Sequence, residues 1–461
     1  MTFQFSRQGL SASERMLERA LEIVPGATSW AILVGMFALS FWQPLLAAML
    51  VIAFDLYWLL RLFYMTLFLT LSWIRLSVER RTDWMAWIRE VDQLVQPTDA
   101  SLAIGWRWSR FPDLCSLWLR QRDLGRLQHS RSLPPSSSQL HHLVIIPIVR
   151  ERRDVVEPGV RSLAQQTFPA RRILVVLALE ERASAEVRAD VYALQELYRP
   201  YFLDLQVIVH PQGLPGEARV KGANATWAAR ASSQLLEQRG IAFEHVIISC
   251  FDADTVVSPE YMACLTYSFM VCPDRTRASF QPIPVYHNNI WDVPGFARVL
   301  DIGSSFFQLI EATNPEHLVT FSSHSMSFQA LVEAGYWPVD LVSDDSAIFW
   351  KAFIHYDGDY RVVPIYVTLS MDIAAAGSWW RAASNVYRQK RRWAWGVENF
   401  PIVVRAFLQR STIPWFDRCR HAFRLFEGHV SWATSAFLLT VLGWVPAVVA
   451  GREFSDSVLY H

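Results

Sequence analysis

The stretch His245-Val-Ile-Ile-Ser-Cys250, followed by Phe251-Asp252-Ala253-Asp254, decides the fold class. Its first half is a short apolar run with β-branched residues, which is typical of a buried strand. Two aspartates come directly after it, and positions two apart face the same way in an extended chain. In open parallel sheets, ligands bind beyond the carboxyl ends of the strands. The stretch therefore predicts a buried strand that delivers two carboxylates to a ligand-binding edge.

Strands and helices alternate on the N-terminal side of this stretch. Three further apolar runs of strand length lie at 143–147, 173–179 and 205–209, and helix-like segments separate them at 160–166, 183–197 and 224–238. Strands that alternate with helices predict a mostly parallel, doubly wound α/β sheet. The residues just after the strands are then the candidates for a site, namely 147–151, Glu180-Glu181, His210-Pro211 and Asp252-Ala253-Asp254.

Asp252 and Asp254 are candidate metal ligands. Carboxylate oxygens suit Mg²⁺ or Mn²⁺, and such an ion keeps positions open for phosphate oxygens. DxD pairs also occur on protein surfaces as solvated charges. On these residues alone, both interpretations stay open.

A second acidic pair lies in Ser343-Asp344-Asp345. Adjacent carboxylates raise one another's pKa, which is what a general base needs. Alternatively, Ser343 or Asp344 caps a helix that runs through 347–353. The two interpretations are compatible, with one residue capping and the other reacting.

The third motif is Gln389-Lys390-Arg391-Arg392-Trp393. On a helix, Gln389, Arg392 and Trp393 share one face. An amide, a fork-shaped cation and a flat ring suit a diphosphate and a sugar or base ring. The alternative is an interfacial helix whose arginines meet lipid phosphates and whose tryptophan lies among the headgroups.

The composition indicates a membrane protein. Of the 461 residues, 52% are apolar and 19% charged, whereas soluble domains have about 45–50% and about 25%. A chain this apolar is not intrinsically disordered. The 43 basic and 43 acidic residues balance, so no net field attracts nucleic acid, and none is expected as a partner. Five cysteines without a CxxC pair indicate reduced thiols, not a disulfide framework or a zinc site.

Two uncharged or nearly uncharged regions predict membrane helices. Residues 27–76 carry only Asp55, Arg61 and Arg75, and the region is too long for one crossing. Pro44 divides it into helices at about 25–42 and 44–62, the second continuing as an interfacial helix to 76. A buried helical hairpin of a soluble protein is the alternative. Residues 430–450 are a further spanning candidate.

Arginines set the expected orientation. They lie before the first hairpin at 7, 15 and 19 and after it at 75, 80 and 81. The positive-inside rule then places both ends of the hairpin and the domain at 139–375 in the cytoplasm, with the chain as a multi-pass protein of the inner membrane. Three crossings would leave the C-terminus outside, so we expect further helices in a longer product or in a membrane subunit. Tryptophans among arginines in 77–130 predict surface helices near the lipid headgroups.

The three motifs, in this order, resemble those of the membrane-embedded family 2 glycosyltransferases, which include cellulose and hyaluronan synthases. The resemblance covers roughly residues 140–400. Three further segments are similar to family motifs: Ile145-Ile-Pro-Ile-Val-Arg-Glu151, Arg219-Val-Lys-Gly-Ala-Asn224 and Gln281-Pro-Ile-Pro-Val-Tyr286. The sequence departs from the family at Glu180-Glu181, where two aspartates are usual, and at Asp344-Asp345, where Glu-Asp is usual.

The resemblance implies a GT-A fold, a nucleotide-sugar donor, a divalent cation (Mg²⁺ or Mn²⁺) and a saccharide or lipid-linked acceptor. It implies that Asp252 and Asp254 contact the metal and the diphosphate, and that Asp345, paired with Asp344, deprotonates the acceptor. Seven residues would contact the donor or acceptor: Glu151, Glu180, Lys221, Asp252, Gln389, Arg392 and Trp393.

These inferences predict six segments and three possible functions. The segments are 1–27 (cytoplasmic), 28–76 (transmembrane hairpin), 77–138 (helical connector and linker), 139–375 (catalytic domain), 376–428 (interfacial helices) and 429–461 (transmembrane helix and tail). The implied reaction is an inverting transfer, by a processive polysaccharide synthase or by an enzyme that transfers one sugar to a lipid acceptor. A catalytically silent membrane scaffold is the third possibility.

Overall fold

The computed structural model describes residues 3–95, 111–128, 133–374 and 378–455. The predicted strand at 245–250 is β4 (Val246–Cys250), and every residue in it is buried. β1 (His141–Ile148), β2 (Ile173–Glu180) and β3 (Asp204–His210) occupy the other predicted runs. β3, β2, β1 and β4 are neighbours in that order, and each pair is parallel. The predicted α/β class with a mostly parallel sheet is therefore confirmed.

Four strands extend the sheet beyond β4, which gives the order β3-β2-β1-β4-β7-β6-β8-β5. β7 (Ser325–Ser327) pairs antiparallel with both β4 and β6 (Ala278–Tyr286). β8 (Arg361–Met371) is parallel to β6, and the short β5 (Val256–Val257) closes the edge antiparallel to β8. The sequence patterns did not predict these four strands. β5 and β7 are too short for a periodicity signal, and prolines interrupt the apolar runs of β6 and β8.

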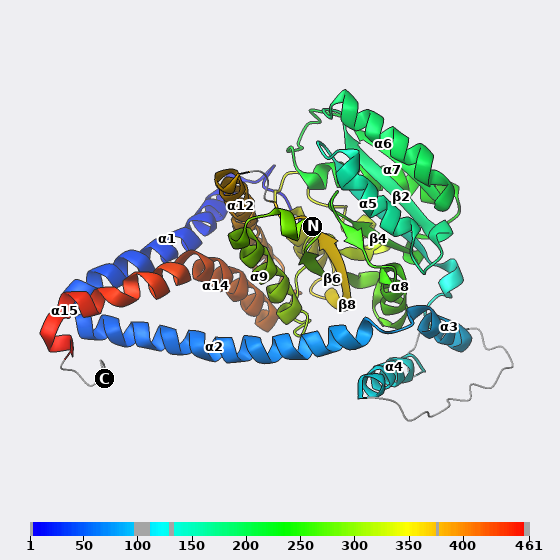
Figure 1. The fold of residues 1–461 in the computed structure, drawn as a ribbon. Helices are drawn as coiled ribbons and strands as arrows, with labels where there is room; N and C mark the ends of the chain where they lie inside the picture. Colours follow the sequence, from blue (N-terminus) through cyan, green and yellow to red (C-terminus); the bar gives the residue numbers. More distant parts are fainter. Residues whose placement is uncertain (1–2, 96–110, 129–132, 375–377, 456–461) are drawn as a thin grey trace. The chain divides into compact units, whose positions relative to one another are not determined.

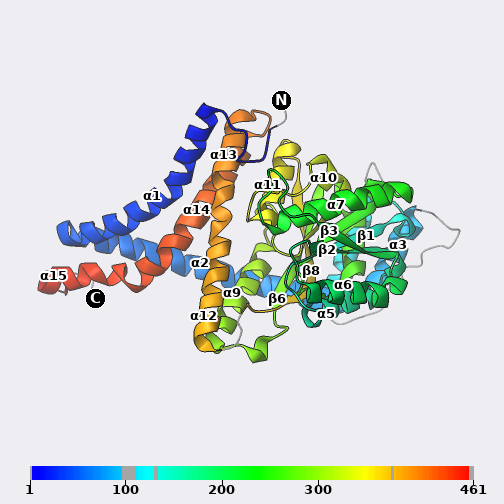
Figure 2. The ribbon, with the colours of Figure 1, turned by 90° about the horizontal axis from the view of Figure 1, so that it is seen from above.

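Helices cover both faces of the parallel half of the sheet. α5 (Arg153–Ala164) and α6 (Ala185–Tyr198) lie on one side of β1–β3, and α7 (Lys221–Gln238) lies on the other (Figure 2). Alternate side chains of β2, such as Val175 and Leu177, belong to the core beneath α5 and α6. The remaining helices of this part are α8 (Tyr261–Val271), α9 (Gly295–Glu311), α10 (Phe328–Glu333), α11 (Asp344–His355) and α12 (Trp379–Ala394).

The prediction of surface helices near the headgroups is wrong for α3 (Trp84–Val95). Trp84 and Trp87 are 3% and 8% exposed, and both rings contact Tyr267 of α8. The pair adds to the apolar core, because two indoles bury a large area where they meet a third ring. α4 (Phe111–Gln128) follows, while Trp106 and Trp108 lie outside the described residues.

Contacts divide the chain into two units, residues 69–393 and residues 3–68 with the segment from 394 onward. The second unit contains α1 (Ala12–Trp42), most of α2 (Pro44–Glu79), α13 (Asn399–Gln409), α14 (Trp415–Thr440) and α15 (Val445–Ser455) (Figure 1). α1 and α2 are long and apolar enough to cross a membrane. Within this unit Arg61 of α2 pairs with Glu427 of α14 at 3.4 Å.

Two details of the membrane-length helices differ from the prediction. α1 begins at Ala12, not near Pro25, because Ser11 and Glu14 form a capping box that starts the helix earlier. The segment 430–450 is not one straight helix, since α14 ends at Thr440 and the chain bends by 48° before continuing. Gly443 lies at this break and Pro446 in the first turn of α15; proline lacks an N–H and favours a new helix start.

Candidate active site

Asp252 lies at the centre of a polar cluster just beyond the carboxyl end of β4. Its carboxylate accepts hydrogen bonds from the Lys221 ammonium, at 2.7 Å, and from the Ser322 hydroxyl. Its backbone N–H donates to Ser323 Oγ at 3.1 Å. Burial alone would raise the pKa of Asp252, but Lys221, the Ser322 hydroxyl and the Arg392 guanidinium outweigh it and lower that pKa.

Ser323, in the loop before β7, has an unusual backbone conformation. Its φ of 59° is in the left-handed region, which is uncommon for a residue with a side chain. The side chain is buried, and besides the Asp252 N–H it contacts Thr255 Oγ1 at 2.8 Å. Gln281 Oε1 accepts the backbone N–H of Phe321 two residues earlier. Such outliers occur at functional sites, where surrounding bonds hold the strain; motif spacing alone did not identify Ser322 or Ser323.

Asp254 is held by two backbone contacts of its own. Its carboxylate accepts the backbone N–H of Asp372 at 3.0 Å, and its own carbonyl accepts the Asn288 amide. Burial and the neighbouring charge of Asp252 raise the pKa of Asp254 to about 7. The two aspartates therefore form a site with excess negative charge, which a cation would relieve.

Lys221, at the first position of α7, joins the two acidic motifs. Its Nζ lies 2.7 Å from Asp252 Oδ1 and 3.0 Å from Asp345 Oδ1. Lys221 and Asp345 are 124 positions apart in the sequence. Burial opposes its charge, but these two carboxylates raise the pKa of Lys221 well above its ordinary value. The DxD motif and the second acidic pair therefore face one ammonium group.

The two members of the second acidic pair have different environments. Asp345 is a quarter exposed, and its backbone carbonyl accepts the Thr320 hydroxyl at 2.6 Å. Asp344 is 4% exposed, and its Oδ2 has no hydrogen-bond partner within the described part of the chain. Burial and the charge of Asp345 raise the pKa of Asp344 to about 8, so it is mostly protonated at neutral pH. The capping interpretation is wrong, because α11 begins at Asp344 without a side-chain cap bond.

Gly222 allows α7 to approach this acidic pair. A Cβ at this position would lie 2.5 Å from the Pro338 carbonyl and 2.9 Å from Asp344 Cβ. Next to it, the Asn224 amide donates to the Ala178 carbonyl of β2 at 2.7 Å. The segment 221–224 therefore anchors α7 to the sheet and places Lys221 beside both acids.

His324 lies beside Asp345, with its Nδ1 3.8 Å from Asp345 Oδ1. Its ring is fully buried, and burial lowers its pKa to about 4. The same Nδ1 lies 3.1 Å from the Phe321 carbonyl. His324 is therefore neutral at pH 7 and is held by the loop.

The residues of the third motif lie on α12. Trp393 contacts Tyr286 at the end of β6 and Phe321 beside the Asp252 loop, with ring centroids 6.4 and 5.8 Å apart. Gln389 Oε1 is buried without a hydrogen-bond partner among the described residues. Arg392 is exposed, yet close enough to help lower the pKa of Asp252.

Glu151 and Glu180 lie at the ends of β1 and β2. The Glu151 carboxylate accepts the backbone N–H groups of Val149 and Arg150, at 2.7 and 2.9 Å, so it shapes its own turn. Glu180 is 6% exposed, and its Oε2 lies 3.5 Å from both Arg182 and His210. Neither carboxylate contacts the Lys221 cluster directly in the described contacts.

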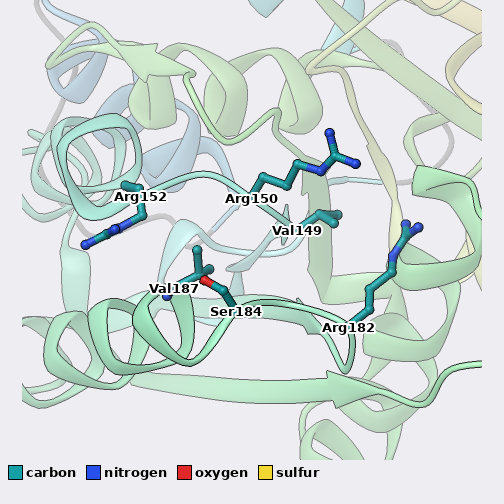
Figure 3. Close-up of a pocket in the computed structure, with 6 residues that line it drawn as sticks. All are labelled: Val149, Arg150, Arg152, Arg182, Ser184 and Val187. Carbon is teal, nitrogen blue, oxygen red and sulfur yellow. Dashed lines mark hydrogen bonds between the residues drawn. The ribbon is translucent and has the colours of Figure 1, made fainter.

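A cavity of about 340 Å³ opens beside these two strand ends. Arg150, Arg152, Arg182, Ser184 and Val187 line it together with Val149 (Figure 3). Arg152 is paired with Glu186 and Asp190. Figure 3 shows the side chains of Arg150 and Arg182 extending in a different direction from that of Arg152. Arg150 has no ion pair among the described contacts, and its guanidinium is the group at this end of the sheet that an anion could approach, which the sequence motifs had not predicted.

The residues fit a divalent cation that is completed by a ligand. In the described residues, no three His, Cys, Asp or Glu side chains come together to enclose a metal ion. Mg²⁺ usually binds through one or two carboxylates plus substrate phosphates, not in an all-protein cage. The donor set, two half-buried carboxylates on one strand end, has this form.

Comparisons with known proteins identify the class of enzyme. Residues 247–451 match the family model described as Glycosyl transferase family group 2. No curated protein sequence matches the chain. One similar solved structure is "Mannosyltransferase PcManGT from Pyrobaculum calidifontis in complex with GDP-Man and Mn2+", with 17% identity, a TM-score of 0.44, and coverage of 75% of this chain and 89% of that one.

Another similar structure is that of S. aureus TarS 1-349, with 15% identity, a TM-score of 0.34, and coverage of 67% of this chain and 88% of that one. TM-scores below 0.5 mark a loose similarity, so the family match carries the assignment. It agrees with the α/β sheet. Residues 247–451 match glycosyl transferase family group 2, and this match identifies the chain as a glycosyltransferase.

Proposed function

We propose that the chain transfers a sugar from a nucleotide-sugar donor to a saccharide or lipid-linked acceptor, with inversion and with Mg²⁺ or Mn²⁺ bound. One observation carries this proposal. Lys221 Nζ lies within 3.0 Å of both Asp252 and Asp345, so acids from two distant motifs face the same point. A transfer reaction needs this arrangement, because the leaving diphosphate and the acceptor hydroxyl meet at one carbon.

Asp252, Asp254 and Arg392 form the donor side. When Mg²⁺ or Mn²⁺ is bound to the two aspartates, its charge helps neutralise the departing diphosphate. Arg392 is exposed and free to close on phosphate oxygens, for which its planar fork is suited. The arginine-lined cavity at the ends of β1 and β2 extends the same edge, and there Glu151 and Glu180 shape the nucleotide pocket.

Asp345 forms the acceptor side. It is a quarter exposed, so an acceptor hydroxyl can reach its carboxylate. In the proposed step Asp345 removes the hydroxyl proton while the oxygen attacks the anomeric carbon, and the diphosphate leaves from the opposite face. A single displacement inverts the anomeric centre. Asp344 beside it is buried and protonated, so it adds no second negative charge next to the base.

Gln389 and Trp393 hold the acceptor sugar in this proposal. The buried Gln389 Oε1 has no hydrogen-bond partner among the described residues and would accept a sugar hydroxyl that enters the site, and the indole of Trp393 offers a flat face. Product length decides between the two acceptor classes, because a polysaccharide synthase makes a polymer and a lipid-directed enzyme adds one sugar.

We place the catalytic unit on the cytoplasmic side of the inner membrane. α1 and α2 supply the membrane-length segments. Arg7 precedes α1, Arg15 and Arg19 lie in its first turns ahead of its apolar part, and Arg80 and Arg81 follow α2. The bent pair α14 and 442–450 provides a third crossing or a re-entrant segment.

Calorimetric binding of UDP and GDP to the purified full chain tests the donor site. We expect one of them to bind more tightly with Mn²⁺ than without it, and the gain to disappear in Asp252→Asn. Binding of neither nucleotide, or equal binding with and without Mn²⁺, would contradict the proposal. Arg391→Met is the matched control, because Arg391 is an exposed cation next to Arg392 and has no assigned contact.

A further inference from the structure

Lys390 and Asp301 form an ion pair that the motif analysis left unassigned. Lys390 Nζ lies 2.7 Å from Asp301 Oδ1 and 3.2 Å from Ser304 Oγ, both on α9. Asp301 is completely buried, and the side chain of Lys390 is 22% exposed. The pair joins α9 to α12 at the residue that follows Gln389.

The same ammonium lies on the face of Trp393. Lys390 Nζ is 3.8 Å from the centroid of the Trp393 ring, well inside the range of a cation–π interaction. Tyr286 and Phe321 contact the same ring. Asp301 therefore fixes Lys390, and Lys390 fixes the orientation of the Trp393 ring, which lies on the same face of α12 as Gln389.

Energetics argue that this pair has a role beyond joining two helices. A buried ion pair is often no more stabilising than apolar residues of similar volume, because both charges lose their hydration. Asp301 Oδ2 adds to that cost, since it has no hydrogen-bond partner within the described residues. Packing of α9 on α12 alone would favour apolar side chains here, whereas placing a positive charge against an indole requires this pair.

We propose that Asp301, acting through Lys390, positions the Trp393 ring for the acceptor sugar. This rests on the proposed function, in which Trp393 contacts the acceptor. Asp301 and Lys390 are positioning residues and touch no substrate themselves. Loss of the pair frees the ring to rotate, so acceptor binding weakens while the donor contacts at Asp252 and Arg392 stay in place.

The test uses the full chain in detergent, with the donor that the wild-type protein turns over. Cellotriose, chitotriose and octyl glucoside serve as acceptor probes. We expect Lys390→Met to raise the acceptor KM about 3- to 10-fold, as expected for losing a cation–π contact, and to change the donor KM less than twofold. Lys390→Arg should restore most of the affinity, and Arg391→Met, one residue away, should leave both constants unchanged.

Two variants keep the test informative if a lone buried charge impairs folding. Asp301→Asn with Lys390→Met removes both charges and should remain folded by thermal unfolding, yet keep the raised acceptor KM. Adding Lys390→Met to Trp393→Leu should cause no further increase, because Lys390 acts through the ring. An unchanged acceptor KM, or an equal rise in the donor KM, would overturn the inference. A wild-type chain that turns over no nucleotide sugar would instead refute the proposed function.

Discussion

Asp345→Asn should separate donor binding from transfer. The substitution keeps the size of the side chain but removes the carboxylate that we assign as the base. Loss of a general base typically lowers the rate by about 10²–10⁴, which corresponds to roughly 3–5 kcal/mol of transition-state stabilisation. The donor should still bind within about threefold, because Lys221 keeps its 2.7 Å contact with Asp252 and an amide at position 345 can still accept a hydrogen bond from Lys221.

The matched comparison is Asp344→Asn. Asp344 is buried and mostly protonated at neutral pH, so an amide of the same shape changes its charge little. Transfer should fall less than about tenfold, since no proton-transfer group is lost. Transfer of radiolabelled sugar and calorimetric binding of the nucleoside diphosphate, measured on the same preparations, report the two steps separately. If Asp345→Asn retained more than a tenth of the transfer rate while Asp344→Asn lost it, Asp344 would be the base.

Four further outcomes are expected. Asp252→Asn, or treatment with EDTA, should reduce donor turnover at least 100-fold; full activity in both would remove the metal from the mechanism. Arg392→Ala should weaken nucleoside-diphosphate binding and turnover together, and a loss of turnover alone would contradict a donor contact. Gly222→Ala should destabilise the fold by about 1–3 kcal/mol in chemical unfolding, because its Cβ would meet Pro338 and Asp344; an unchanged midpoint would contradict the close approach. A cysteine placed on the exposed face of α6 should stay unlabelled from outside intact cells, and strong labelling would reverse the topology.

A pH dependence follows from Asp344. Its pKa is about 8 in the folded chain and about 4 when unfolded, so the folded state binds the proton more tightly. The stability that this proton provides is complete below pH 4 and is lost as the pH rises through 8. The melting temperature of Asp344→Asn should therefore fall less between pH 5 and 9 than that of the wild type, and parallel curves would show that Asp344 is charged throughout.

The sequence predicted those features that depend on local patterns. Four parallel strands followed from apolar runs. Asp252 lies just after a strand end, where ligands bind in open parallel sheets. The break at Gln43 between the first two membrane-length helices also followed from a local signal, Pro44.

What the sequence did not predict depends on contacts between distant residues. Lys221 and Asp345 are 124 positions apart, and Lys390 and Asp301 are 89 apart, so no periodicity connects them. Trp84 was misplaced because a tryptophan suits both a headgroup region and a protein core, and only its contact with Tyr267 decides. The left-handed backbone at Ser323 has no signal in a single sequence, since serine rarely adopts it.

One measurement tests the central claim most directly: release of nucleoside diphosphate from a panel of UDP- and GDP-sugars by the purified full chain with Mn²⁺. We predict that at least one donor is turned over when an acceptor is present, and that Asp345→Asn reduces this release by about 10² or more. Release from no donor, or release that is equal in wild type and Asp345→Asn, would contradict the account.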